Sequence, residues 1–177
     1  MKVLGFCGPS GVGKTTLMTA LITELKARGQ RVSVIKHAHH TFDIDTPGKD
    51  TWRHREAGAF EVLIASGTRL AKMREYEAPG QPSVHQLIAE MIECDWLLVE
   101  GFKHAAIPKI EVWRAACGEA PLYPEEPFIA AIATDAPGAL PVPTARPVFD
   151  LAAPAVLVSH LLDTAARFDY DPQIHGH

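Results

Sequence analysis

Short apolar runs alternate along this chain with segments whose apolar residues recur every three or four positions. The run KVLGFCG, from Lys2 to Gly8, is short and continuous, which is typical of a strand buried on both faces. A helix closed by Gly29 is predicted from Thr15 to Arg28, because its apolar residues share one face. These residues are Leu17, Met18, Leu21, Ile22 and Leu25.

The next part of the chain predicts a polar loop and a small β-ribbon. A second strand, RVSVIKH, precedes AHHTFDIDTPGKD, which has no apolar period and carries the turn signal Pro47-Gly48. A short helix near Thr51 to Ala57 then leads into FEVLIAS. The run RLAKMREY is expected to pair with FEVLIAS as a neighbouring strand.

Ser83 is predicted to begin a further helix. Ser83 and Gln86 have the spacing of a capping box, in which each side chain bonds the backbone N–H of the other residue. A continuous apolar stripe follows on one face and consists of Val84, Leu87, Ile88, Met91 and Ile92.

Three more apolar runs, WLLVEGF, KIEVWRA and FIAAIATD, predict strands. The Pro-rich segment APGALPVPTARPVFD then separates the last of them from a terminal helix near Ala155 to Arg167. Apolar strands that alternate with helices favour an α/β fold, with a mostly parallel sheet covered on both faces. RLAKMREY and KIEVWRA are candidates for exposed edge strands at which a second copy of the chain pairs.

Composition limits the class of protein. A chain of 177 residues with 47% hydrophobic content predicts one domain, residues 1–177. The net charge of -4 argues against nucleic-acid and membrane partners, because both require a basic face. The three cysteines have no CxxC spacing, which suits a reducing compartment. Because no secretory signal or bilayer-length apolar run is visible, we expect a cytoplasmic protein.

The segment GPSGVGKT, from Gly8 to Thr15, fits the phosphate-loop pattern G-x-x-x-x-G-K-[ST] between a predicted strand and a predicted helix. Its glycines allow backbone N–H groups to curl around phosphates, and the helix N-terminus adds partial positive charge. Lys14 is expected to bind the β and γ phosphates, and the Thr15 hydroxyl to ligate magnesium. The predicted phosphate-binding residues are Ser10, Gly11, Val12, Gly13, Lys14, Thr15 and Thr16. The fold expected is P-loop NTPase-like, with three layers and a small β-ribbon excursion.

A carboxylate at the carboxyl end of a neighbouring strand is needed to complete the magnesium site. The run CDWLLVEGF offers Asp95 and Glu100, which an extended strand separates by about 16 Å. Glu100 lies at the carboxyl end, so we assign it to the magnesium shell and to catalysis with Lys14. Asp95 is then a solvated residue where the strand begins.

The loop from His37 to Asp50 leaves the carboxyl end of the second strand and is therefore expected to lie over the phosphates. It holds three aspartates that can orient a metal-bound water; the residues do not decide among them, and we assign Asp45 as the catalytic candidate. The loop is also locally cationic. Zinc is the alternative for His37, His39 and His40, but no cysteine or fourth ligand is spaced to complete a tetrahedron.

Base selection has one candidate residue. Guanine presents N1–H and N2–H₂ together, so a carboxylate accepts from both, whereas the N1 acceptor of adenine repels it. Asp135 follows the apolar strand FIAAIAT and is a candidate for this role. The N-K-x-D pattern that usually marks guanine is absent, and Asp135-Ala-Pro is equally a turn start.

Three blocks of sequence carry a family resemblance: GPSGVGKTTL, IKHAHHTFDIDTPGKDTWRHREAGA and LLVEGFKHAAIPKIEVWR. They lie between Val3 and Arg114, with a looser match at IAAIATDAP, and resemble the MobB family, the adaptors of molybdopterin-guanine dinucleotide biosynthesis. The resemblance implies a homodimer that binds GTP and Mg²⁺ and hydrolyses GTP weakly. It also implies that the protein assists the guanylyltransferase MobA and contacts molybdenum-insertion proteins.

Residue by residue, the resemblance supports Gly11 to Thr16 as the phosphate site and Glu100 as its acidic partner. It adds Lys36, His37, the Asp43 to Asp50 loop and Lys103 to the expected functional surface. Position 9 is Pro, so the additional signature lysine of the dimeric partitioning ATPases is missing.

Three functions are weighed, of which a metal-handling chaperone that uses the histidines ranks last because too few ligands are present. A GTP-binding adaptor fits a complete phosphate site beside a long polar loop. A P-loop small-molecule kinase using ATP or GTP is the alternative, but it needs an arginine-bearing lid, and no compact Arg-x-x-x-Arg segment is evident. We also expect slow hydrolysis, since no arginine is plainly supplied to the phosphates from the chain itself.

Overall fold

The computed structural model describes residues 1–38, 41–78, 80 and 82–172. The chain forms two compact units, Met1–His37 with Ser83–His177, and Ala38–Pro82. The first unit holds the central sheet, and the second holds a helix and a two-stranded ribbon.

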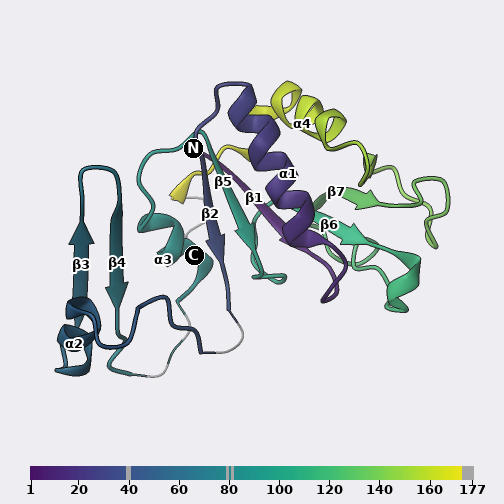
Figure 1. Cartoon of the computed structure of the whole chain (residues 1–177). Coiled ribbons are helices and arrows are strands. Elements are labelled where there is room, and N and C mark those ends of the chain that lie inside the picture. The colour runs from purple at the N-terminus through teal and green to yellow at the C-terminus, as the bar shows by residue number, and fades with distance from the viewer. Residues whose placement is uncertain (39–40, 79, 81, 173–177) are drawn as a thin grey trace. The chain divides into compact units, whose positions relative to one another are not determined.

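The central sheet has six parallel strands in the order β2-β5-β1-β6-β7-β8 (Figure 1). Strand β1, which precedes the phosphate loop, therefore has β5 on one side and β6 on the other. The carboxyl ends of all six strands meet at one edge of the sheet. The strands are β1 Lys2–Cys7, β2 Val32–Lys36, β5 Trp96–Glu100, β6 Lys109–Trp113, β7 Ile129–Thr134 and β8 Val148–Asp150.

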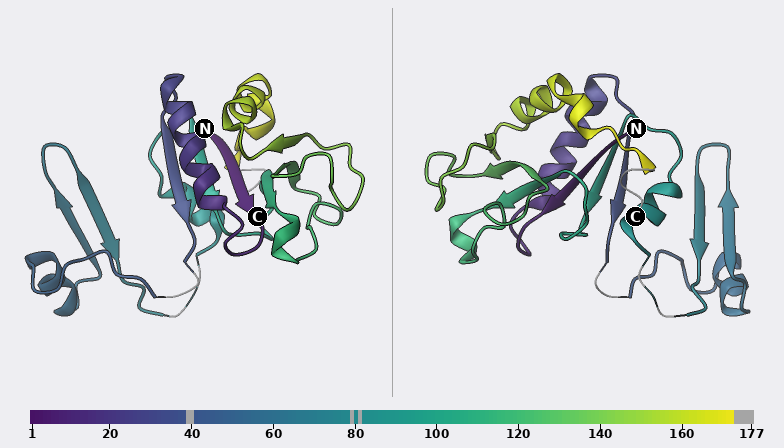
Figure 2. Two further views of the ribbon diagram at one scale, coloured as in Figure 1. Left: turned by 45° about the vertical axis from the view of Figure 1, so that its right-hand side comes forward. Right: turned by 180° about the vertical axis from the view of Figure 1, so that it is seen from behind.

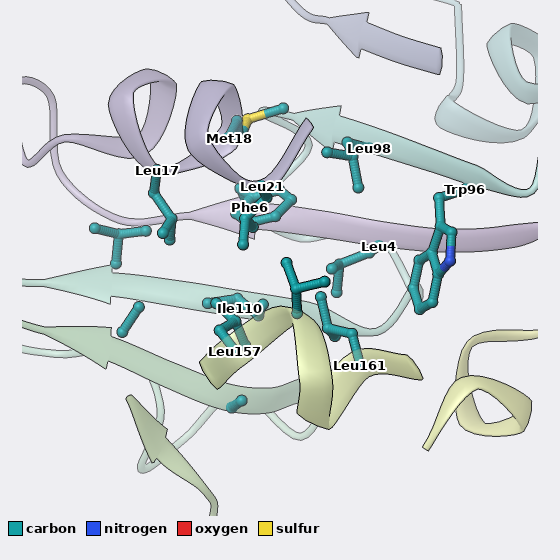
Figure 3. Close-up of a cluster of buried hydrophobic side chains, with 14 of the residues drawn as sticks. Leu4, Phe6, Leu17, Met18, Leu21, Trp96, Leu98, Ile110, Leu157 and Leu161 are labelled. Atoms are coloured by element: carbon teal, nitrogen blue, oxygen red, sulfur yellow. The ribbon is translucent and has the colours of Figure 1, made fainter. Parts of the chain in front are cut away.

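Helices cover both faces of this sheet, which confirms the α/β prediction (Figure 2). Because side chains alternate along a strand, Leu4 and Phe6 of β1 face helices α1 (Lys14–Ala27) and α4 (Pro154–Asp163). Figure 3 shows this cluster, in which Leu17, Met18 and Leu21 of α1 lie against the strands. On the opposite face, Val3, Leu97 and Val99 pack against Val84 and Ile88 of α3 (Val84–Ala89).

The helix that begins after Ser83 is shorter than predicted. The capping box is present, with the Ser83 hydroxyl accepting from Gln86 N and the Gln86 side chain accepting from Ser83 N. The helix ends at Ala89, and the N–H groups of Glu90 and Met91 form tight i to i−3 hydrogen bonds. The predicted stripe therefore stops early, and Ile92 is 81% exposed.

Three other predictions about elements need correction. KIEVWRA is not an edge strand, because β6 lies between β1 and β7. The Pro-rich segment contains a short strand, β8, which adds to the sheet beside β7. The terminal helix is two elements, α4 and the 3-10 helix η2 (Ala165–Phe168).

Strand β6 carries two fully buried charged side chains, which its central position explains. The Glu111 carboxylate accepts hydrogen bonds from the backbone N–H groups of Leu122 and Tyr123, each at 2.7 Å. Burial raises the pKa of Glu111, although these two bonds oppose the shift. Lys109 donates to Ala105 O at 2.5 Å, and its Nζ lies 3.8 Å from Glu126. Glu111 thus anchors the loop at Leu122 to the sheet.

The second unit contains α2 (Asp50–Glu56) and the antiparallel strands β3 (Glu61–Ala65) and β4 (Leu70–Arg74). The predicted ribbon is confirmed, with Glu61 opposite Arg74 and Ala65 opposite Leu70. Large apolar side chains are exposed on the ribbon: Leu63, Ile64 and Leu70 are 56%, 51% and 63% exposed.

No helix within the described residues combines the length and apolar character that crossing a membrane requires.

Candidate functional site

The phosphate loop lies between β1 and α1, as the sequence predicts. Gly8, Gly11 and Gly13 all have positive φ, and Gly13 is the N-cap of α1. Helix α1 buries four of its side chains in the core, which fixes the start of the helix beside the loop. They are Leu17, Met18, Leu21 and Leu25. Backbone N–H groups at this helix N-terminus are available to an anion.

Gly8 is the most closely packed glycine of the loop. A Cβ added to Gly8 would lie 2.1 Å from the carbonyl oxygen of Val112 in β6. Nothing lies within 4 Å of the same atom at Gly11. The absence of a side chain at Gly8 therefore lets the loop lie close against β6, whereas Gly11 serves only the curvature of the loop.

Lys14 points into the loop that precedes it. Its Nζ donates to Gly8 O at 3.0 Å and to Pro9 O at 2.6 Å. Its neighbours Ser10, Thr15 and Thr16 are exposed, whereas Val12 is buried. A cation stationed on the loop carbonyls, beside exposed backbone N–H groups, suits a bound phosphate chain.

Thr15 and Glu100 meet at the adjacent strand end. The Thr15 hydroxyl donates to Glu100 Oε1 at 3.0 Å, and Lys36 Nζ lies 3.7 Å from Glu100 Oε2. The Glu100 side chain is 14% exposed, and that of Lys36 is 62% exposed. Asp95 lies at the opposite end of β5, where its carboxylate accepts from Arg31 N. A hydroxyl and a carboxylate side by side are oxygen donors of the kind that Mg²⁺ takes together with phosphate oxygens and water.

The segment after Glu100 has an unusual backbone. Phe102 has a φ of 51°, a value uncommon for a residue with a side chain, and its ring stacks on His37 with 4.6 Å between ring centroids. His37 N donates to Glu100 O at 2.9 Å, which joins the ends of β2 and β5. Lys103 follows and is exposed. His37 and Lys103 therefore lie on the segments that flank Glu100.

Sequence reasoning missed Arg114, which follows β6 and lies against the phosphate loop. Its Nε donates to Val12 O at 2.9 Å, and its Nη1 donates to Asp135 Oδ2 at 2.8 Å. Its Nη2 lies 3.6 Å from where a Gly13 Cβ would stand. The only signal in the sequence was its place just after an apolar strand. The structure thus brings an arginine to the loop, where the sequence showed none, and pairs it with the candidate base reader Asp135.

Asp45 belongs to the second unit, and its partners Thr51 and Arg55 belong to the same unit. Its carboxylate accepts from the Thr51 hydroxyl at 2.8 Å and lies 3.6 Å from Arg55 Nε. Arg55 also contacts Asp43 at 2.7 Å and Glu75 at 3.3 Å. The hydrogen bond from Arg55 lowers the pKa of Asp43. Asp45 is only 6% exposed, so it takes part in an ion-pair cluster that holds the loop to α2.

His39 and His40, two of the three histidines of the zinc alternative, lie outside the described residues. Within the described ranges, no group of three or more His, Cys, Asp or Glu side chains is arranged to hold a metal ion. A Mg²⁺ site of the kind predicted does not need such a group, because phosphate and water supply most of its ligands.

Comparison with known proteins identifies related sequences. The family model of molybdopterin guanine dinucleotide synthesis protein B, MobB, matches residues 3–135. A molybdopterin-guanine dinucleotide biosynthesis adapter protein of Haemophilus influenzae is 44% identical over 137 residues, which cover 77% of this chain and 76% of the relative. The adapter protein of Escherichia coli is 42% identical over 143 residues, covering 77% and 80%.

Solved structures support the same fold. The crystal structure of Bacillus subtilis MobB superposes with a TM-score of 0.73 at 23% identity, covering 97% of this chain and 100% of the other. The MobB homologue of Bacillus stearothermophilus gives 0.68 at 24% identity, covering 94% and 99%. At these identities the likeness shows that the chain shares the α/β fold of these structures.

Proposed function

Because the chain belongs to the MobB family, the adapter proteins of molybdopterin-guanine dinucleotide biosynthesis, we propose that it binds GTP with Mg²⁺ at the phosphate loop. One observation carries this proposal. Lys14, the loop glycines and the Thr15–Glu100 pair lie together at the carboxyl edge of the sheet. A triphosphate and its metal need a cation, N–H donors and oxygen ligands in this arrangement.

Different residues of the site bind the phosphates and the metal. Backbone N–H groups from Gly11 to Thr16 surround the phosphates, and Lys14 exchanges the Gly8 and Pro9 carbonyls for phosphate oxygens. Thr15 and Glu100 would hold the metal, directly or through water, while Lys36 partly offsets the negative charge of Glu100. Bound Mg²⁺ neutralises charge on the β and γ phosphates.

Hydrolysis of GTP is expected to be slow. Asp45, the candidate for orienting water, is bonded within its own unit to Thr51 and lies 3.6 Å from Arg55 Nε. Glu100 is engaged by Thr15, so it serves the metal rather than a water nucleophile. Slow turnover is what an adaptor needs, because the bound nucleotide then persists while partners assemble.

A homodimer and further partners complete the proposal. The ribbon of β3 and β4 has unpaired outer edges among the described residues and exposes Leu63, Ile64 and Leu70, which supports pairing with a second copy. The guanylyltransferase MobA and molybdenum-insertion proteins are the proposed partners, in the cytoplasm. Sedimentation of the full chain tests the dimer, and a monomer at high concentration would remove it from the proposal.

Calorimetric titration of the full chain tests nucleotide binding, with GTP, ATP and GDP, with and without Mg²⁺. Lys14→Ala is expected to lower GTP affinity at least about tenfold, because a charge-assisted contact to phosphate is lost. Lys26→Ala is the matched control, since Lys26 is an exposed cation in the last turn of the same helix. Equal GTP affinity for Lys14→Ala and Lys26→Ala would refute the site.

The same samples are then incubated with small hydroxyl-bearing metabolites. We expect no transfer of the γ phosphate. Phosphoryl transfer to a metabolite would replace the adaptor with a small-molecule kinase.

A further inference from the structure

The residues that follow three neighbouring strands, β1, β6 and β7, contact one another at the carboxyl edge of the sheet. β1 leads to the phosphate loop, β6 to Arg114 and β7 to Asp135. The Arg114 guanidinium binds Val12 O through Nε and Asp135 through Nη1. One side chain therefore bonds both the candidate phosphate site and the candidate base reader.

The link between Arg114 and Asp135 is suited to exchange. Their side chains are 37% and 43% exposed, so water screens the ion pair and the pair adds little net stability. By contrast, the bond from Nε to Val12 O is part-buried and holds the arginine at the loop. A ligand that competes for the Asp135 carboxylate thus frees one end of the guanidinium while the other end stays in place.

Guanine is such a competitor. It offers N1–H and N2–H₂ to one carboxylate, whereas adenine offers an acceptor at N1. Once Asp135 is taken, Nη1 of Arg114 loses its carboxylate partner, and Nη2 already lies 3.6 Å from where a Gly13 Cβ would stand, beside the proposed phosphate site. Adenine leaves the ion pair with Asp135 intact and the guanidinium neutralised.

We propose that Arg114 and Asp135 form a relay, in which a guanine base takes the Asp135 carboxylate and the released Arg114 binds the phosphates of the same nucleotide. The relay rests on the nucleotide binding proposed above and assigns Arg114 as a specificity-determining residue that need not touch the base.

The experiment measures affinities of the full chain for GTP, ATP and inorganic tripolyphosphate, all with Mg²⁺. The variants are Arg114→Ala, Arg114→Lys, Asp135→Asn and the double variant Arg114→Ala/Asp135→Asn. Arg28→Ala is the matched control: it removes an arginine of the same unit that bonds Ser159 and Ala155 O. Thermal unfolding of each variant checks that it is folded.

Arg114→Ala is expected to lower the affinity for GTP about tenfold and the affinity for ATP less than about threefold, because only GTP frees the guanidinium for a charge-assisted contact. Asp135→Asn is expected to raise the affinity for tripolyphosphate about threefold, because it releases Arg114 from the ion pair. The double variant is expected to lose this gain. Arg114→Lys keeps the charge but not the two-ended bonding, so its GTP to ATP ratio should fall between wild type and Arg114→Ala.

Equal weakening of GTP and ATP by Arg114→Ala would overturn the relay and leave Arg114 as a support of the loop. Unchanged tripolyphosphate affinity in Asp135→Asn would also overturn it. Failure of the proposed function is a separate result, namely that Lys14→Ala leaves GTP affinity unchanged. Should Arg114→Ala not fold, the Arg114→Lys ratio and the Asp135→Asn tripolyphosphate result still decide the proposal.

Discussion

Gly8→Ala tests how tightly the phosphate loop is seated on the sheet. Gly8 has a φ of 130°, and an added Cβ would lie 2.1 Å from Val112 O. Backbone strain of this kind costs about 1–3 kcal/mol. Forcing a methyl group into a filled space costs about 1–3 kcal/mol more. Because the obstructing atom belongs to the backbone of a central strand, it has little freedom to move, and we expect unfolding free energy to fall by about 2–6 kcal/mol.

Gly11→Ala is the matched control for this substitution. Gly11 also has a positive φ, 74°, but nothing lies within 4 Å of its added Cβ. Only the left-handed conformation is then penalised, at about 1–2 kcal/mol. The assay is urea denaturation of both variants without nucleotide, with unfolding free energies compared at equal slope. A loss for Gly8→Ala no larger than that for Gly11→Ala would refute the claim that the close approach of the loop to Val112 O requires glycine at position 8.

Three other predictions follow from the site and the core. Glu100→Gln is expected to weaken Mg²⁺-dependent GTP hydrolysis more than GTP binding, measured by phosphate release and calorimetry; equal losses would argue against its metal role. Burial raises the pKa of Glu111, so the fold favours its protonated form. The protonated side chain therefore stabilises the fold fully below about pH 4.5, and this stabilisation is lost as the pH rises through the folded pKa. Glu111→Gln does not titrate, so urea unfolding across pH should show the wild type losing stability relative to this variant as pH rises; a constant difference would contradict the assignment. Leu21→Ala, at a fully buried position of α1, should cost about 2–5 kcal/mol in urea, and a loss below 1 kcal/mol would mean that the core collapses around it.

The structure also explains where local patterns misled. The apolar stripe after Ser83 continues to Ile92, yet the chain must leave the helix to begin β5 at Trp96, so Ile92 remains exposed. KIEVWRA contains Lys and Glu, which favour an exposed edge, but both side chains are buried because β6 lies between β1 and β7, and hydrogen bonds offset part of the cost of burying them. Neither conflict can be resolved from neighbouring residues alone.

Local spacing determined much of this protein. The apolar periods predicted α1, the ribbon and the strands of the central sheet other than β8. The pattern from Gly8 to Thr15 predicted the phosphate loop between β1 and α1, because these features depend on residues a few positions apart. Strand-end reasoning also gave Glu100, which the fold brings to Thr15.

Only the tertiary structure decided which strands are neighbours, and with them the rest of the site. Arg114 meets Val12 across 102 positions of sequence because β6 lies beside β1, and it meets Asp135 because β7 lies beside β6. The same neighbour relation makes Gly8, rather than Gly11, the crowded glycine of the loop. Strand order is set by how all the helices and strands bury their apolar faces together, so no short stretch of sequence encodes it.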